Sequence, residues 1–281
     1  MIPEVTGIQR VGGVEVPTTD AAGLGTWAVE QGHTFREAVA LGLDAGIWPE
    51  GLVRNHPFFS AAEQARIVRG TVAIAGCGGL GGYLATLCAR AGVGGFILAD
   101  HDVFDPTNAN RQALCDMGTL GRQKAVVCAA HCRAVHPWIE ARAVAMEITE
   151  GNAIEIMAGA DVVLDGLDRT AARFVLCGAA ARLGVPYVHG AVLAASGQAS
   201  TFLPGAATGL ESLYPDKQDT ADPPGVVSTA PAIVASIQTR EALRILAGHP
   251  PVMCGKLIYF DGEDSSVYTM ELMPHTPESI T

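Results

Sequence analysis

The chain has 281 residues, 49% hydrophobic and 17% charged, a composition that is typical of a globular protein and not of a disordered one. Its formal net charge of −11 disfavours nucleic acid and anionic membrane as partners, because both repel an acidic surface. We expect a cytoplasmic protein, because no segment resembles a membrane span or signal peptide and the seven cysteines, an odd number, are scattered along the chain as free cysteines would be in a reducing compartment.

Residues 1–50 are rich in glycine and have no regular pattern, and we expect them to form an N-terminal extension. One helix is predicted over Thr34–Leu43, with Thr34 as its N-cap and Glu37 three residues later. Trp48-Pro49-Glu50 then indicates a turn. The residues of this segment point to no function.

From Thr71 onward, short apolar runs alternate with helical segments. Strands are predicted over Thr71–Ala75, Gly95–Asp100, Ala141–Met146, Asp161–Asp165, Pro186–His189 and Gln198–Leu203. Helices are predicted over Gly82–Ala91, Arg122–His136, Asn152–Ala158, Thr170–Leu183 and Ala230–Leu246. This alternation is typical of a Rossmann-like, doubly wound α/β fold, with a mostly parallel sheet and helices on both faces.

The C-terminal part has a different pattern. Pro204–Gly225 is rich in proline and glycine and has no apolar period, which predicts a long loop of the kind that often carries function. Lys256–Asp261 and Ser266–Leu272 alternate in polarity and predict a closing antiparallel hairpin. We therefore expect one domain over residues 51–281, whose parallel sheet ends in a C-terminal antiparallel extension.

A glycine-rich turn lies between the first predicted strand and its helix. Gly76, Gly78 and Gly81 form G-x-G-x-x-G, and Gly79 lies within the same turn. These glycines permit a tight turn, close approach of phosphate to the backbone, and close helix–strand packing. Asp100 ends the next strand, where its carboxylate could accept hydrogen bonds from ribose hydroxyls. The turn predicts a nucleotide site but does not distinguish NAD from ATP.

The segment after the second strand carries several polar residues at fixed spacing. It reads Asp100-His-Asp-Val-Phe-Asp-Pro-Thr-Asn108-Ala-Asn-Arg111-Gln112 and is followed by Gly121-Arg-Gln-Lys124. This arrangement resembles the ThiF/MoeB/HesA family, the bacterial relatives of ubiquitin-activating enzymes. The resemblance continues through Val162–Asp168, Pro186–Gly190, Gly197-Gln198 and Gly255-Lys256 and covers roughly residues 50–272.

The resemblance implies ATP-dependent adenylylation of the C-terminal glycine carboxylate of a ubiquitin-like sulfur-carrier protein, in thiamine or molybdenum- or tungsten-cofactor sulfur transfer. It assigns Asn108, Arg111 and Lys124 to the triphosphate and Asp168 to Mg²⁺. Such cations would offset the repulsion between a carboxylate and the phosphates. The attacking carboxylate is already ionised at neutral pH, so the reaction needs no general base.

A weaker match lies upstream of the glycine turn. Leu52-Val-Arg54-Asn55 loosely resembles the family's N-terminal arginine region, from which an arginine reaches the ATP of the partner subunit. The resemblance therefore implies a homodimer in which Arg54 completes the neighbouring site. His189 precedes a glycine at a strand end, and we expect it to line the pocket floor as a structural residue rather than to shuttle protons.

The sequence departs from the family pattern in its cysteines. Many members hold a structural zinc with two C-x-x-C pairs, which this chain lacks, and Cys128, His131 and Cys132 are interpreted as one helix face, so no zinc is expected. In some members of the family, a cysteine in the loop before the last helix receives the activated carboxyl group. The corresponding residues here, 219–231, contain no cysteine, and Cys254 lies beyond that helix, so a thioester intermediate is not expected. Arg169 follows Asp168 and adds a positive charge near the phosphates.

Three alternatives stay open. The chain could tailor a small ribosomal peptide, although such enzymes often carry an N-terminal peptide-clamp domain for which about 50 residues are expected to be too few. It could be an NAD(P)-dependent oxidoreductase, but Arg111 and Lys124 would then have no evident purpose. It could be a scaffold without activity, but the presence of Asn108 and Asp168 beside those two cations disfavours this.

Overall fold

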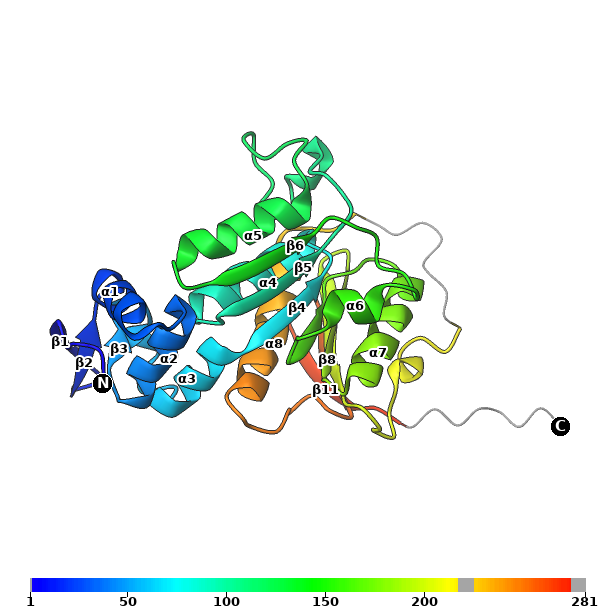
Figure 1. Ribbon diagram of the computed structural model, residues 1–281. Helices are drawn as coiled ribbons and strands as arrows, with labels where there is room; N and C mark the ends of the chain where they lie inside the picture. The colour runs from blue at the N-terminus through cyan, green and yellow to red at the C-terminus, as the bar shows by residue number, and fades with distance from the viewer. Residues whose placement is uncertain (1, 217–224, 274–281) are drawn as a thin grey trace.

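The structure is a computed structural model that describes residues 2–216 and 225–273. The described residues form a three-stranded sheet at the N-terminus and an eight-stranded sheet that carries most of the chain (Figure 1). The small sheet contains β1 (Gly7–Val11), β2 (Val14–Thr19) and β3 (Trp48–Pro49). The large sheet contains β4 (Thr71–Ala75), β5 (Gly95–Ala99), β6 (Glu140–Val144), β7 (Val162–Asp165), β8 (Tyr187–Leu193), β9 (Ser196–Phe202), β10 (Lys256–Phe260) and β11 (Val267–Glu271).

Helices connect these strands. The α-helices are α1 (Ala21–Gln31), α2 (Phe35–Asp44), α3 (Ala61–Arg69), α4 (Gly79–Arg90), α5 (Lys124–Val135), α6 (Ala153–Met157), α7 (Thr170–Leu183) and α8 (Thr229–Leu246). The described residues also form three short 3-10 helices, η1 (Glu50–Asn55), η2 (Pro106–Asn108) and η3 (Leu210–Ser212), the last within the predicted 204–225 loop. The strands and helices predicted from Thr71 onward are confirmed with shifted ends, whereas residues 217–224 of that loop lie outside the described residues.

The large sheet has the strand order β11-β10-β9-β8-β7-β4-β5-β6. Strands β4 to β8 run parallel to one another, whereas the pairs β8–β9, β9–β10 and β10–β11 are antiparallel. The predicted doubly wound sheet with an antiparallel extension is therefore confirmed. The chain leaves β4 towards β5 and β6, then returns to β7 on the other side. Ala75 consequently pairs with Ala99 of β5 and with Asp165 of β7, and this switch point is where such sheets bind ligands.

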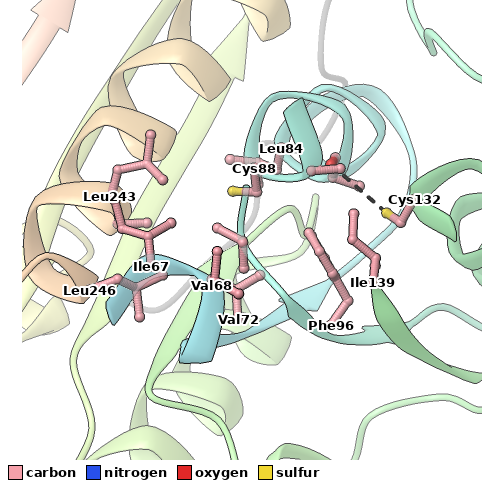
Figure 2. Packing of buried hydrophobic residues seen from close by; sticks show 14 of the residues in the cluster. Ile67, Val68, Val72, Leu84, Cys88, Phe96, Cys132, Ile139, Leu243 and Leu246 are labelled. Atoms are coloured by element: carbon pink, nitrogen blue, oxygen red, sulfur yellow. Dashed lines mark hydrogen bonds between the residues drawn. The ribbon is translucent and has the colours of Figure 1, made fainter. Parts of the chain in front are cut away.

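The two faces of the sheet bury separate hydrophobic clusters, because neighbouring side chains of a strand point to opposite faces. Val72 and Ile74 of β4 point to the face that is covered by α4, α5 and α8. Figure 2 shows this cluster, in which Leu84 of α4 and Leu243 of α8 gather on one side of the sheet. Ala73 and its neighbours pack on the other face, against α6 and α7. No helix in the described part of the chain is long and apolar enough to cross a membrane.

The N-terminal extension is a folded unit rather than an irregular segment. Strands β1 and β2 form a hairpin whose turn, Gly12-Gly13, has the two positive φ angles that tight hairpins require. The predicted cap of α2 is confirmed, because the Thr34 side chain accepts a hydrogen bond from the Glu37 N–H. The turn predicted at Trp48-Pro49-Glu50 is wrong, since Trp48 and Pro49 pair in parallel with β2 as β3.

Arg36 of α2 fastens this unit to the large sheet. Its guanidinium donates to the carbonyl oxygens of Val68 (2.9 Å) and Gly70 (2.8 Å), and also to that of Arg69, at the C-terminal end of α3. It forms an ion pair with Glu140 at 3.1 Å. These carbonyl groups have no partner within their own helix, so one arginine caps α3 and joins α2 to β6.

We expect Arg36→Ala to lower the free energy of unfolding by about 2 kcal/mol, the range for hydrogen bonds that involve a charged group. Chemical denaturation measures the change. Arg10→Ala is the control, because Arg10 is exposed on β1, and it should leave stability unchanged. Equal stability of the two variants would show that Arg36 does not hold the N-terminal unit in place.

Candidate active site

The turn between β4 and α4 is packed against its own helix and against β7. Gly76 has a φ of +82°, and its N–H donates to Ala99 at 2.8 Å. A Cβ at Gly81 would lie 1.7 Å from the Gly76 oxygen, and one at Gly76 would lie 2.5 Å from the Gly166 oxygen. The turn therefore tolerates no side chain at either glycine. The predicted roles of these residues in tight turning and close packing fit this geometry.

The first turn of α4 presents backbone N–H groups at the carboxyl edge of the sheet. Gly78 is the N-cap residue and makes no side-chain cap, and Gly79 begins the helix. Such a terminus favours an anion such as phosphate. Gln112 lies against this turn, 3.3 Å from a Cβ built on Gly78, and its buried Oε1 has no hydrogen-bond partner among the described residues. Sequence reasoning gave Gln112 no role, although it belongs to the quoted motif.

Asp100 follows β5 and braces the glycine turn. Its carboxylate accepts hydrogen bonds from the N–H of Cys77 at 2.7 Å and from the N–H of Asp102 at 2.8 Å. Burial raises the pKa of the Asp100 carboxyl above its ordinary value, although these two hydrogen bonds oppose the shift. The predicted hydrogen bond from ribose hydroxyls to Asp100 would come in addition to these two backbone contacts, and it stays a prediction.

Lys124 begins α5 and contacts Asp102, whose N–H in turn donates to the Asp100 carboxylate. The Lys124 ammonium is 3.0 Å from the Asp102 carboxylate, and the Lys124 N–H donates to the Asp102 carbonyl at 2.9 Å. Only 6% of Lys124 is exposed, so its charge is directed into the site rather than into bulk water. A positive charge is unfavourable at a helix N-terminus, and the Asp102 carboxylate offsets it here.

The loop between β5 and α5 holds the remaining motif residues. Asn108 is buried in η2, and its side-chain oxygen accepts a hydrogen bond from the Asp105 N–H at 3.1 Å. The Arg111 guanidinium donates to the Thr107 carbonyl and the Asn110 side-chain oxygen, both at 2.9 Å. Asn110 in turn donates to Val226 at 3.0 Å, just before α8. Arg111 is thus held by its own loop, and that loop touches the connection to α8.

Asp168 is exposed on the short loop after β7, at the same edge of the sheet. Asp165, the last residue of β7, holds this loop in place by hydrogen bonding. One Asp165 carboxylate oxygen accepts the Leu167 N–H at 2.9 Å, and Arg173 donates to the Leu167 carbonyl at 2.6 Å. An exposed carboxylate on a rigid loop could hold Mg²⁺ beside a phosphate, as predicted for Asp168.

The other Asp165 oxygen is the centre of a buried polar cluster that sequence reasoning did not predict. It lies 3.2 Å from Arg173 Nε, 2.7 Å from the Tyr187 hydroxyl and 2.8 Å from His189 Nδ1. Burial raises the pKa of the Asp165 carboxyl, but Arg173, His189 and Tyr187 more than offset this, and the pKa lies below its ordinary value. Asp165 is therefore an anion in the fully buried site.

Arg54 and the cysteines lie apart from these groups. Arg54 is exposed in η1, and the adjacent Asn55 donates to the Ala91 carbonyl at the C-terminal end of α4. Because α4 spans about 18 Å, Arg54 does not reach the glycine turn of its own chain. Cys128 and Cys132 face the hydrophobic core, which confirms their interpretation as one helix face. Low zinc content stays a prediction.

The close contact between Gly81 and the Gly76 carbonyl can be tested by substituting Gly81 and, as a control, the adjacent Gly82. Gly81→Ala should greatly lower the melting temperature and abolish nucleotide binding, because its Cβ would overlap the Gly76 carbonyl. Gly82→Ala is the matched control, since its Cβ would meet nothing nearer than 3.6 Å and alanine favours the helix. Thermal unfolding of both variants measures the difference, and similar melting temperatures would contradict the packing described for the turn.

The buried imidazole predicts an acid-sensitive stability. Burial lowers the pKa of His189 below its ordinary value, so below about pH 6.5 the unfolded chain binds more protons than the folded chain. The free energy of unfolding should therefore fall as the pH drops from about 7 to 5, and His189→Asn should reduce this slope. The pKa of His136 is lowered to about 4 by burial, so part of the slope should remain. Urea unfolding across this window measures it, and an unchanged slope would exclude His189 as a contributor.

The chain is similar to several other proteins, and it spans only 59% of the length of the first of them. It is 32% identical to the probable adenylyltransferase/sulfurtransferase MoeZ of Mycobacterium tuberculosis over 233 residues, which cover 79% of this chain but 59% of MoeZ. It is 32% identical to the SAMP-activating enzyme E1 of Haloferax volcanii, with 75% of this chain and 79% of that protein covered. The sulfur carrier protein adenylyltransferase of Thermus thermophilus is 30% identical, with 72% and 79% covered.

Solved structures with the same fold include PaaA, with a TM-score of 0.68, 19% identity, and 79% of this chain and 73% of PaaA covered. E. coli MccB with ATP has a TM-score of 0.67 and 18% identity, with 76% and 67% covered. The model of the ThiF family matches residues 52–279, which include every motif residue described above. Since this match spans most of the chain, the protein belongs to the ThiF family.

Proposed function

We propose that this protein is an ATP-dependent adenylyltransferase that activates the C-terminal glycine carboxylate of a ubiquitin-like sulfur-carrier protein. The observation that carries the proposal is the gathering of the Gly76–Gly81 turn, Asp100, Lys124 and Asp168 at the carboxyl edge of β4, β5 and β7. The names of the relatives support it, since they are adenylyltransferases rather than oxidoreductases. Thiamine and molybdenum- or tungsten-cofactor synthesis are the proposed settings.

The proposed reaction is attack of a carboxylate oxygen on the α-phosphorus of ATP. A carboxylate–phosphorus bond forms, the bond from that phosphorus to the bridging oxygen breaks, and pyrophosphate leaves with the electron pair. Lys124 and Arg111 would offset the charge of the phosphates, and the α4 N-terminus would donate N–H groups to them. Mg²⁺ on Asp168 would neutralise further phosphate charge. No proton has to be removed from the nucleophile.

The proposal also covers Arg54, the oligomeric state, the product and the cellular location. Arg54 would act on the ATP of a second subunit, because it is exposed and lies far from the glycine turn of its own chain. This role requires a homodimer. The acyl-adenylate itself would be the product, passed to a separate sulfur donor without a thioester. We place the enzyme in the cytoplasm, consistent with its free cysteines.

A second candidate is the tailoring of a small ribosomal peptide by the same chemistry. The observation that favours it is the N-terminal unit, since residues 7–49 fold into a sheet and two helices despite their short length. Strand β1 lies at the edge of that sheet. A structure of MccB, one of the proteins that share the fold, contains the peptide MccA. The two candidates differ only in whether the carboxylate belongs to a folded carrier or to a peptide.

ATP–pyrophosphate exchange tests both candidates directly. The protein should catalyse exchange with Mg-ATP when a sulfur-carrier protein ending in glycine is present, and not when that carrier lacks its terminal residue. Short peptides with free C-termini form the second arm of the assay. Exchange with peptides but with no carrier would select the second candidate, and no exchange with either substrate class would overturn adenylylation.

Two substitutions test the proposed roles within that assay. Asp168→Asn and Arg111→Ala should each cut exchange by about two orders of magnitude, the scale for loss of one preorganised electrostatic contact. The double variant should be little worse than the weaker single one, because both residues would act on the same triphosphate. Arg182→Ala, at the far end of α7, is the control and should exchange normally. Wild-type rates in both single variants would show that the site lies elsewhere.

A further inference from the structure

Asp102 is an acidic residue within the site that is proposed to bind a polyanion. Its carboxylate lies 3.0 Å from the Lys124 ammonium, and its N–H donates to one oxygen of the Asp100 carboxylate at 2.8 Å. The other Asp100 oxygen accepts the N–H of Cys77, in the glycine turn, at 2.7 Å. The pair of Asp102 and Lys124 is therefore connected to the glycine turn through a single carboxylate.

A phosphate that enters this part of the site meets two carboxylates and one ammonium. Burial is the main reason that the pKa of Asp100 is raised, while the charge of Lys124 opposes this shift and the charge of Asp102 adds to it. Both charges therefore act on the same carboxyl group. Only the ammonium attracts phosphate, and in this structure it is already paired with Asp102. Asp102 lowers the attraction for an anion in two ways, because it occupies Lys124 and repels the phosphate.

The two partners of this ion pair differ in their surroundings. The side chain of Lys124 is 8% exposed, whereas that of Asp102 is 52% exposed. A second Asp102 oxygen lies 3.3 Å from His101 Nε2, and His101 is exposed as well. If the pair separates, Asp102 has water and His101 as partners, but Lys124 has little water and stays at the N-terminus of α5. The lysine therefore exchanges one anion for another and does not become free.

We propose that Asp102 is an inhibitory counter-ion, which holds Lys124 before the nucleotide binds and which the phosphate groups must displace. This inference rests on the proposed function and adds the residue that limits the affinity of the site for phosphate. Asp102 keeps a nearly buried ammonium charged and in place, so it stabilises the protein and weakens binding at the same time. It also recaptures Lys124 when pyrophosphate leaves, which favours release of that product.

The test uses two substitutions of Asp102 and one control. Asp102→Asn removes the charge and keeps the size of the side chain, and Asp102→Ala removes the side chain beyond Cβ. Both keep the hydrogen bonds to Asp100 and Lys124 that the backbone of residue 102 makes. Glu147→Gln is the matched control, because it removes one charge from an exposed residue beyond the end of β6, at the same edge of the sheet. The probes are Mg-ATP and inorganic pyrophosphate, and calorimetry measures the Kd of each.

Each Asp102 variant should lower the Kd for both probes about five-fold, the scale of one partly exposed ion pair. The melting temperature of each variant without ligand should fall by a few degrees, because Lys124 loses its partner. A residue with only a structural role would weaken binding as it lowers stability, so the opposite signs of the two changes distinguish the roles. Glu147→Gln should leave the Kd and the melting temperature as in the wild type.

Unchanged or weaker binding of the probes by both Asp102 variants would overturn the inference. An equal gain in Glu147→Gln would also overturn it, since net charge and not the contact with Lys124 would then explain the effect. Failure of the wild type and all variants to bind either probe would instead overturn the proposed function, and the inference with it.

Discussion

The site depends on one buried anion. Burying a carboxylate is strongly unfavourable unless its charge and its lone pairs are satisfied, and Asp165 meets this condition with Arg173, Tyr187, His189 and the Leu167 N–H. These partners come from the loop after β7, from α7 and from β8. Removal of any one would leave part of the charge uncompensated in a site that water does not reach. The cluster therefore fixes the loop after β7 and the strand beside it in one relative position.

The glycine turn imposes the second constraint. Because Gly81 approaches the Gly76 carbonyl too closely for any Cβ, α4 must leave β4 in one direction, with its first N–H groups at the sheet edge. Asp100 then braces the turn from β5 by accepting the Cys77 N–H. Strands β5 and β7 flank β4, so the turn is held from both sides before any nucleotide binds. As the proposed anion site, a turn preorganised in this way would lose little entropy on binding.

Sequence reasoning predicted the parts of the molecule that depend on local pattern. The alternation of apolar runs and helices predicted the large sheet, and the spacing from Asp100 to Lys124 identified the family. The cluster around Asp165 could not be predicted, because its partners are brought together only by strand pairing and helix packing. In the N-terminal unit α2 was predicted, but the strands were missed because they are short and β3 has only two residues, although Gly12-Gly13 is a local hairpin signal. Helix α3 was also missed, although the Ser60–Glu63 capping box marks its start.

The ion pair between Lys124 and Asp102 bears on how an acidic chain can bind a polyanion. Net charge acts over distances at which salt screens it, whereas the α4 N-terminus and Lys124 act at contact distance in a partly buried site. A triphosphate near Lys124 would have to compete with Asp102, so the gain in binding is the difference between two ion pairs and not the full attraction of one. Asp102 is half exposed and can regain water when it loses the lysine, whereas a phosphate held by α4 would stay in place. This difference in solvation favours transfer of Lys124 to the nucleotide.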